Sequence, residues 1–195
     1  MHSHPDAAEP LNLELRRARR ADRLVLRSML ELYLHDLSEY WPYELDVHGQ
    51  FGYHTLDYYW RAEDHAAFVF LVDGRYAGFA LVNSDVLMPE NTRWLAQFFV
   101  LRGYRRRGVA SAAARQVFDR LPGRWEVGEL PNNLPAQAFW RRLIADYSGG
   151  RYTDQYFTDG TWEGFVQCFD NHAYADTAGA QPEPGDPPDA SPSLY

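Results

Sequence analysis

The chain has 195 residues, of which 46% are hydrophobic and 15% aromatic, so it is long enough to bury one substantial core as a single domain. Its formal net charge of −8 argues against general nucleic-acid binding, which needs a basic surface. No run of about eighteen apolar residues could span a membrane, and the single cysteine, Cys168, excludes a disulfide or a multi-thiolate metal site within the chain.

The first predicted elements are a strand and a helix. Leucines alternate with polar residues at residues 11–17, which predicts a half-buried strand. From Asp22 onwards apolar residues recur at intervals of three and four, which predicts a helix with one buried face that ends before Trp41. Residues 1–10 lack the charged start and apolar centre of a signal peptide. We therefore expect a flexible N-terminus and a cytoplasmic protein.

Residues 38–66 are the least periodic part of the predicted domain, and they mix aromatic rings with carboxylates. A long irregular segment in a compact domain is often a lid or a binding loop. Aromatic rings beside carboxylates suit a cationic amine. The alternative is that these rings only cover the hydrophobic core.

Three antiparallel strands are predicted next. Residues 68–72 and 76–82 are apolar runs joined through Asp73-Gly74, which is a strong hairpin signal. After a connection at residues 85–93, residues 94–101 form an apolar and aromatic run that only Gln97 interrupts. This run predicts the central strand of the sheet.

A basic turn and a small-residue helix follow the central strand. Arg102, Arg105, Arg106 and Arg107 lead into Gly108, after which apolar residues repeat at helical spacing to about residue 121. The first turn of a helix has unpaired N–H groups and a partial positive charge, and a glycine lets a ligand approach the backbone. The turn can therefore bind phosphate, although arginine clusters are often only solvated surface. The chain has neither the Gly-Lys-Ser/Thr of a P-loop nor the Gly-x-Gly-x-x-Gly of a dinucleotide site.

The remaining elements complete the sheet. Residues 125–130 predict a strand parallel to residues 94–101, because a helix connects the two. A second helix starts at Leu134 with Asn133 as its N-cap, and residues 151–158 and 162–169 form a last hairpin. Residues 170–195 are rich in proline and hold five carboxylates with no arginine, which predicts a disordered tail.

Two short motifs resemble signatures of the GNAT family of N-acetyltransferases. Residues 105–110, Arg-Arg-Arg-Gly-Val-Ala, match Arg/Gln-x-x-Gly-x-Gly/Ala between a strand and a helix. Asn133 and Ala136 match Asn-x-x-Ala-x-x-x-Tyr, but Trp140 stands at the tyrosine. The resemblance covers residues 11–169. It implies an α/β (α+β) fold with a mixed, mostly antiparallel sheet of six or seven strands and helices on both faces.

The resemblance also implies acetyl-CoA as co-substrate and no metal. The pyrophosphate is expected on the backbone amides of residues 106–111, and the pantetheine arm along the central strand, where it splays from its parallel neighbour. The residues expected to bind the cofactor are Phe98, Phe99, Val100, Arg105, Arg106, Arg107, Gly108, Val109, Ala110, Ser111, Asn133, Phe139 and Trp140.

Acyl transfer to an amine needs a group that accepts the amine proton. The family often places a carboxylate on the central strand, where this chain has only Gln97, an amide that cannot act as a base. The candidate bases are Glu44, Asp46, Glu126 and Glu129, of which Glu129 is selected.

A donor for the departing thiolate is the second requirement. Tyr104 and Tyr156 are candidate hydroxyls, with Tyr104 selected. The favoured explanation is that the thiolate leaves without a donor, in which case Trp140 is a packing residue. The residues expected to bind the acceptor are Tyr40, Trp41, Glu44 and Tyr58.

The sequence therefore predicts an N-acetyltransferase that acts on a primary amine of a small molecule or peptide. The alternative is a non-catalytic acyl-CoA-binding module that acts through a protein partner. Neither nucleic acid nor a membrane is an expected partner, and a homodimer is left open. The sequence does not identify the acceptor.

Overall fold

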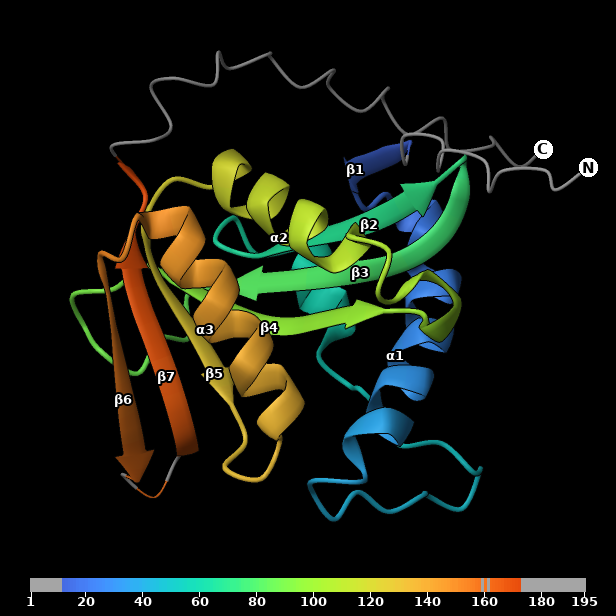
Figure 1. Cartoon of the computed structure of the whole chain (residues 1–195). Helices are drawn as coiled ribbons and strands as arrows, with labels where there is room; N and C mark the ends of the chain where they lie inside the picture. The colour runs from blue at the N-terminus through green and yellow to red at the C-terminus, as the bar shows by residue number, and fades with distance from the viewer. Residues whose placement is uncertain (1–11, 159, 161, 173–195) are drawn as a thin grey trace, which may run out of the picture.

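The computed structural model describes residues 12–158, 160 and 162–172 of the chain. Its centre is a seven-stranded sheet in the order β1-β2-β3-β4-β5-β7-β6 (Figure 1). The strands are β1 (Leu13–Arg17), β2 (Ala66–Val72), β3 (Arg75–Asn83), β4 (Arg93–Val100), β5 (Arg124–Glu129), β6 (Tyr152–Thr158) and β7 (Glu163–Asp170). Only β4 and β5 are parallel, so the predicted mixed, mostly antiparallel sheet is confirmed.

The predicted hairpin between β2 and β3 is present. Asp73 and Gly74 both have positive φ, at 51° and 73°, as a two-residue turn matching the twist of the strands requires. In the structure the first strand starts at Leu13, two residues later than predicted, and Leu11 lies outside the described residues.

Helices cover both faces of the sheet. Helix α1 (Arg23–Leu37) packs on one face together with a short 3-10 helix, Leu56–Trp60, where Leu56 and Tyr59 are buried. Helices α2 (Val109–Arg120) and α3 (Leu134–Ser148) pack on the other face around Phe118, Trp125 and Ile144. Both helices lie in front of the sheet in Figure 1. The expectation of helices on both faces is therefore confirmed.

The end of the described chain corrects the expected start of the tail at residue 170. Strand β7 includes Asp170, and the next residue, Asn171, is only 1% exposed. The Asn171 side chain accepts a hydrogen bond from the Gly123 N–H (2.8 Å) and donates one to the Phe118 carbonyl (2.6 Å). The packed domain thus reaches past Phe169. Residues 1–11 and 173–195, which contain the expected flexible ends, lie outside the described residues.

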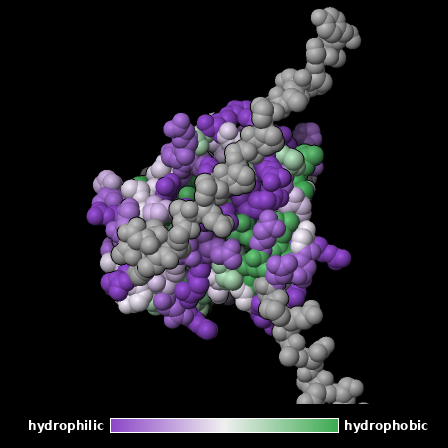
Figure 2. Space-filling view, turned by 90° about the horizontal axis from the view of Figure 1, so that it is seen from above, coloured by the Kyte–Doolittle hydropathy of each residue, from purple (hydrophilic) through white to green (hydrophobic). Residues whose placement is uncertain are grey.

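The hydrophobicity of the helices and of the surface is described next. Within the described residues, no helix is long and apolar enough to cross a membrane. Polar and charged side chains cover most of the face shown in Figure 2, with apolar residues in small areas between them.

Candidate active site

The sheet opens between β4 and β5. The two strands pair only at Arg93 with Trp125 and at Trp94 with Glu126. A β-bulge in β4 accounts for the divergence, because Leu81 pairs with Gln97 while the next residue of β3 pairs with Leu95. Figure 1 shows β4 and β5 running in diverging directions. The backbone of β4 beyond Trp94 therefore faces a gap instead of a neighbouring strand.

One compartment, which we call the turn compartment, lies where the end of β4 meets the starts of α2 and α3. Its volume is about 580 Å³. It brings together most of the residues expected to bind a cofactor, namely Phe98, Phe99, Val100, Arg105, Arg106, Gly108, Ala110, Ser111, Asn133, Phe139 and Trp140. Tyr40, expected on the acceptor side, also lines it.

The start of α2 gives the turn compartment an anion-binding end. Gly108 is the N-cap with φ of 80°, and Arg106 before it also has a positive φ, of 58°. The first helical bond runs from the Ala112 N–H to the Gly108 carbonyl (3.0 Å), so the amides of residues 109–111 precede the helical ladder. A Cβ atom on Gly108 would meet nothing within 4 Å. The space in front of these amides is therefore open to a phosphate group.

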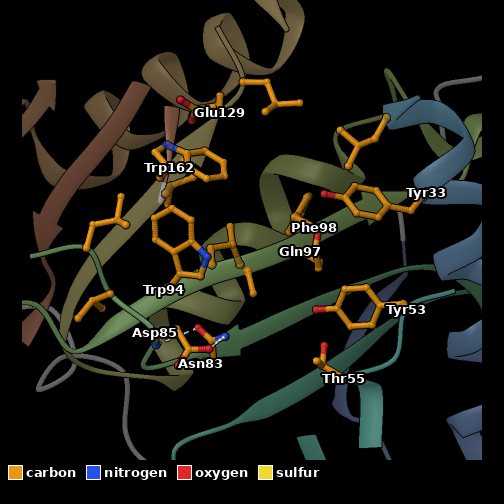
Figure 3. A pocket seen from close by; sticks show the side chains of 18 of the residues that line it. Tyr33, Tyr53, Thr55, Asn83, Asp85, Trp94, Gln97, Phe98, Glu129 and Trp162 are labelled. Atoms are coloured by element: carbon orange, nitrogen blue, oxygen red, sulfur yellow. Dashed lines mark hydrogen bonds between the residues drawn. The ribbon is translucent and has the colours of Figure 1, made fainter. Parts of the chain in front are cut away.

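A second compartment, which we call the aromatic compartment, lies beside the same gap and has a volume of about 930 Å³. Figure 3 shows Trp94 and Trp162 on one side and Tyr33 and Tyr53 on the other, with both hydroxyls directed into the space. The two indole rings meet edge to face with centroids 5.4 Å apart. The compartment is thus a slot between two aromatic walls.

Polar groups lie at one end of the slot. Asn83 donates a hydrogen bond to Asp85 Oδ2 (2.8 Å), which holds this carboxylate at the edge of the compartment (Figure 3). Gln97 of β4 lies on the floor between the two walls.

The two compartments meet. Both are lined by Tyr33, Leu37, Phe98, Asn133, Ala136 and Trp140. Tyr33 comes from α1, and its ring is held edge-on against Phe79 (6.0 Å) and Phe99 (5.9 Å). The site can therefore hold two molecules whose reacting groups meet at the gap, beside the Tyr33 side chain.

The model of the acetyltransferase (GNAT) family matches residues 26–144, which is more than half of the chain. The chain belongs to this family. Family members transfer an acyl group from acetyl-CoA, so the protein is an acetyl-CoA-dependent acyltransferase. The turn compartment fits this cofactor, because it combines an open helix start for the phosphates with an unpaired edge of β4 for the arm.

Solved structures share the GNAT fold. An acetyltransferase from Thermus thermophilus is 16% identical, with a TM-score of 0.54 and coverage of 81% of this chain and 96% of that one. An aminoglycoside acetyltransferase in complex with coenzyme A is 15% identical, with a TM-score of 0.59 and coverage of 86% and 100%. A putative acetyltransferase from Salmonella typhimurium with acetyl-CoA is 14% identical, with a TM-score of 0.55 and coverage of 80% and 91%. No curated protein matches significantly in sequence.

The arginines of the GNAT turn fall into two groups: some form contacts within the protein, and another faces the turn compartment. Arg102 and Arg105 both bind the Asp36 carboxylate (2.6 and 2.5 Å), and Arg105 also donates to the Val100 carbonyl (2.7 Å). These two arginines therefore fix the turn to α1 and β4. Arg106 is exposed and lines the turn compartment.

Two residues expected to bind the cofactor lie outside the turn compartment. Arg107 points its guanidinium over the Tyr104 ring (5.8 Å), and Val109 is fully buried in the core. Neither side chain lines the turn compartment. The left-handed turn at Arg106 directs Arg107 toward Tyr104, and the helical period of α2 directs Val109 into the core.

Trp140, at the place of the family's tyrosine, packs against aromatic neighbours. It is 6% exposed, and its ring lies 5.1 Å from Phe98, 4.9 Å from Phe139 and 6.4 Å from Phe118. The expected packing role therefore agrees with its environment.

Glu129, the selected base, lines the aromatic compartment but is buried. It is 3% exposed, and neither carboxyl oxygen has a well-formed hydrogen-bond partner among the described residues. Burial raises the pKa of Glu129 to about 8; nearby Gln167 opposes the shift and Asp154 adds to it. The carboxyl therefore keeps its proton at neutral pH in this structure.

Two other candidate bases, Glu126 and Asp46, accept hydrogen bonds that hold loops in place. Glu126 accepts hydrogen bonds from the Leu87 and Met88 N–H groups and from Asn91, which fixes the connection before β4. Asp46 accepts from two backbone N–H groups of its own loop, at His48 and Gln50. Neither side chain lines a compartment.

Several sequence-selected residues lie away from the site. Tyr104 packs on the core beside α2, and Tyr156 donates to Glu163 at the sheet edge, so neither hydroxyl reaches a compartment. Trp41 and Glu44 are exposed and line neither compartment, whereas Tyr58 lines the aromatic compartment. The loop at residues 41–50 is exposed throughout, and Tyr43 is the one of its side chains that lines the aromatic compartment.

Sequence reasoning missed most of the aromatic compartment. Tyr53 and Tyr59 belong to the irregular segment 38–66, which was interpreted as a lid or binding loop. The residues missed are Tyr33, Asn83, Asp85, Trp94 and Trp162. They come from separated segments whose local patterns only indicate helix, loop or strand. Tyr33 could have been found from its position, because it stands on the buried face of α1 and ends in a polar group.

Within the described residues, no group of three or more His, Cys, Asp or Glu side chains could hold a metal ion.

Proposed function

We propose that the protein transfers the acetyl group of acetyl-CoA to the primary amine of a small molecule or peptide, across the gap between β4 and β5. The observation that carries this proposal is the meeting of the turn compartment and the aromatic compartment at Tyr33, Phe98 and Trp140. Acetyl-CoA, when bound, supplies an activated acetyl group as a thioester. The residues of the chain bind and orient the reactants and move protons.

Backbone groups do most of the proposed binding on the cofactor side. The amides of residues 109–111 would hold the pyrophosphate, with Arg106 adding a screened positive charge. The free edge of β4 at residues 98–100 would pair with the pantetheine arm. A backbone N–H of this edge would polarise the acyl carbonyl.

Glu129 is the proposed acceptor of the amine proton. It lines the aromatic compartment, and because its pKa is raised to about 8 it accepts the proton in its ionised form, which becomes the larger fraction above that pH. Both oxygens are out of solvent contact, with Trp162 beside them (Figure 3). The proton can therefore reach Glu129 only when the bound amine displaces neighbouring side chains.

Tyr33 is the proposed hydrogen-bond donor to the departing sulfur. It supplies the one hydroxyl among the residues that line both compartments, and its ring is fixed by Phe79 and Phe99. Burial raises the pKa of Tyr33 above its usual range, so the hydroxyl keeps its proton. It stabilises a thiolate by hydrogen bonding rather than by full proton transfer.

Release of free CoA in the presence of an amine panel tests the proposal, with acetyl-CoA binding measured separately by calorimetry. The background is low, because the chain has no lysine to acetylate and burial raises the pKa of its one thiol, Cys168, to about 12. Turnover with any primary amine supports acetyl transfer. Binding without release across the panel would favour the non-catalytic acyl-CoA-binding module, for which the loss of the family's tyrosine at Trp140 is the supporting feature.

The proposal includes a cytoplasmic location, where acetyl-CoA is made. A second copy of the chain is not needed to complete the site, because residues of one chain line both compartments.

A further inference from the structure

The aromatic compartment has a composition that restricts the acceptor. Aromatic rings from α1, from the segment before β2, from β4, from α3 and from the approach to β7 line it: Tyr33, Tyr43, Tyr53, Tyr58, Tyr59, Trp94, Phe98, Trp140 and Trp162. Its volume of about 930 Å³ lies in the range of cavities that hold a small organic ligand, roughly 300–1,000 Å³. The walls therefore offer flat apolar surfaces to a ligand of one or two rings.

The wall beside the gap is built on a glycine. A Cβ atom on Gly128 of β5 would lie 2.5 Å from Trp94 Cη2 and 2.9 Å from Trp162 Cζ2. The two indoles therefore rest directly on the β5 backbone, where β5 has separated from β4. A flat group stacked on them would lie next to the position where the acyl group is expected.

The opposite wall carries hydroxyls. Tyr33 and Tyr53 direct theirs into the slot from the α1 side (Figure 3). Aromatic faces attract a cation, and a phenol can hydrogen-bond a single polar group of a ligand. This wall suits one amine together with an apolar body.

The charge of the lining is small. Its carboxylates are Asp85 and Glu129, and the Glu129 oxygens have no solvent contact. Asp85 is exposed, so it is the carboxylate that a ligand can reach among the described lining residues. The accessible carboxylate of the lining can therefore balance the positive charge of one ammonium group. Several ammonium groups would be placed against aromatic walls without counter-charges, at a desolvation cost.

We propose that the acceptor is a monoamine whose body is a flat aromatic ring, held between the Trp94–Trp162 pair and the Tyr33–Tyr53 pair. Asp85, at the edge of the compartment, attracts the ammonium form as it enters, before the neutral amine reacts at the gap. This inference rests on the proposed function and names the acceptor class for that same site.

The first test compares amines in the CoA-release assay. Tryptamine and 2-phenylethylamine represent the proposed class, ethylamine the amine without a ring, and spermidine, kanamycin and a tripeptide with a free N-terminus the competing classes. The expected result is a kcat/KM for the two ring amines at least about tenfold higher than for every other acceptor, which corresponds to about 1.4 kcal/mol. A preference for spermidine, kanamycin or the tripeptide would overturn the inference and leave acetyl transfer in place.

A binding measurement separates the two proposals. Calorimetry of tryptamine and spermidine against the protein saturated with CoA reports acceptor affinity without turnover. Tighter binding of tryptamine with no CoA release in the first assay would contradict the proposed function only. Equal or tighter binding of spermidine would contradict the acceptor class whether or not turnover occurs.

Variants locate the binding surface. Trp94→Leu should raise the KM or Kd for tryptamine about fivefold or more, because one stacking face is lost, and should leave the acetyl-CoA affinity within about twofold. Asp85→Asn should weaken tryptamine binding and reduce its dependence on salt. Trp41→Leu is the matched control, because Trp41 is 49% exposed and lines neither compartment. Unchanged tryptamine binding in folded Trp94→Leu would overturn the proposed site.

Discussion

The turn compartment and the aromatic compartment meet at one gap but are built in different ways. In the turn compartment, consecutive residues from β4 to α2 present backbone groups, and their side chains mainly fix the turn or line its edge. In the aromatic compartment, aromatic side chains from five separated segments form the walls. The first should therefore tolerate most side-chain changes that leave the backbone open, while the second should respond to single side chains.

The largest expected effect is on the aromatic side, at Glu129. Glu129→Gln keeps the shape and removes the proton acceptor, so kcat should fall on the order of 100-fold while the acetyl-CoA affinity stays unchanged. In the wild type, kcat should rise with pH through a midpoint near pH 8, as Glu129 ionises. In steady-state assays at saturating amine, the kcat of the variant should not show this rise with pH. A variant with the wild-type profile would remove Glu129 from the mechanism.

The same substitution has an effect on stability whose sign follows from the raised pKa. The unfolded Glu129 loses its proton near pH 4.5 and the folded one near pH 8, so the folded state binds more protons between these values. The free energy of unfolding of the wild type should therefore fall as pH rises from about 4.5 to 8. Glu129→Gln removes this cost of ionising a buried carboxyl and should be more stable than the wild type above pH 8, by on the order of 5 kcal/mol. Urea unfolding at pH 5 and pH 8.5 checks this, and equal differences at both pH values would contradict it.

The largest effect on the cofactor side should come from a blocked backbone. Gly108→Val places a branched side chain in the open space before the α2 amides, at a φ of 80° that such residues rarely adopt. Acetyl-CoA should bind at least about tenfold more weakly by calorimetry, about 1.4 kcal/mol. Gly103→Val is the matched control, since Gly103 lies in the same turn without a positive φ, and a Cβ atom there would also meet nothing within 4 Å. Equal affinities of the two variants would show that the helix start does not bind the cofactor.

This contrast also explains what the sequence could predict. The strand–turn–helix unit is local, so the order of the arginines and Gly108 along the chain was enough to predict the turn compartment. The strands, their hairpins, the parallel crossover and the helix faces followed from periodicity and turn residues. The order of the whole sheet, including the placement of β7 between β5 and β6, was not predicted, because it depends on long-range pairing. Trp94 and Asp85 carry no local signal of a shared site, because they and Tyr33 become neighbours only when the sheet and α1 pack. The segment 38–66 was interpreted as a lid or binding loop from its composition. Its residues Tyr43, Tyr53, Tyr58 and Tyr59 line the aromatic compartment, whereas Trp41 and Glu44 do not.

A smaller effect is expected at the junction. Tyr33→Phe removes the hydroxyl and keeps the ring contacts with Phe79 and Phe99, so kcat should fall about five- to tenfold with unchanged acetyl-CoA affinity. Tyr53→Phe, which alters the aromatic compartment only, should change the amine KM more than kcat. Steady-state kinetics with the best amine measures both. A Tyr33→Phe enzyme with wild-type kcat would mean that the thiolate leaves without a donor.

The smallest effect should distinguish two neighbouring arginines of the turn. Arg106 is exposed on the rim of the turn compartment, whereas the Arg107 guanidinium lies over the Tyr104 ring. Arg106→Ala should weaken acetyl-CoA binding only about threefold at low salt and should flatten the salt dependence, because a screened charge is lost while the backbone amides remain. Arg107→Ala is the matched control and should change neither quantity by more than about twofold. Calorimetry at low and high salt tests the pair. A loss at Arg106 as large as that of Gly108→Val would mean that side chains, rather than the backbone, hold the cofactor's phosphates.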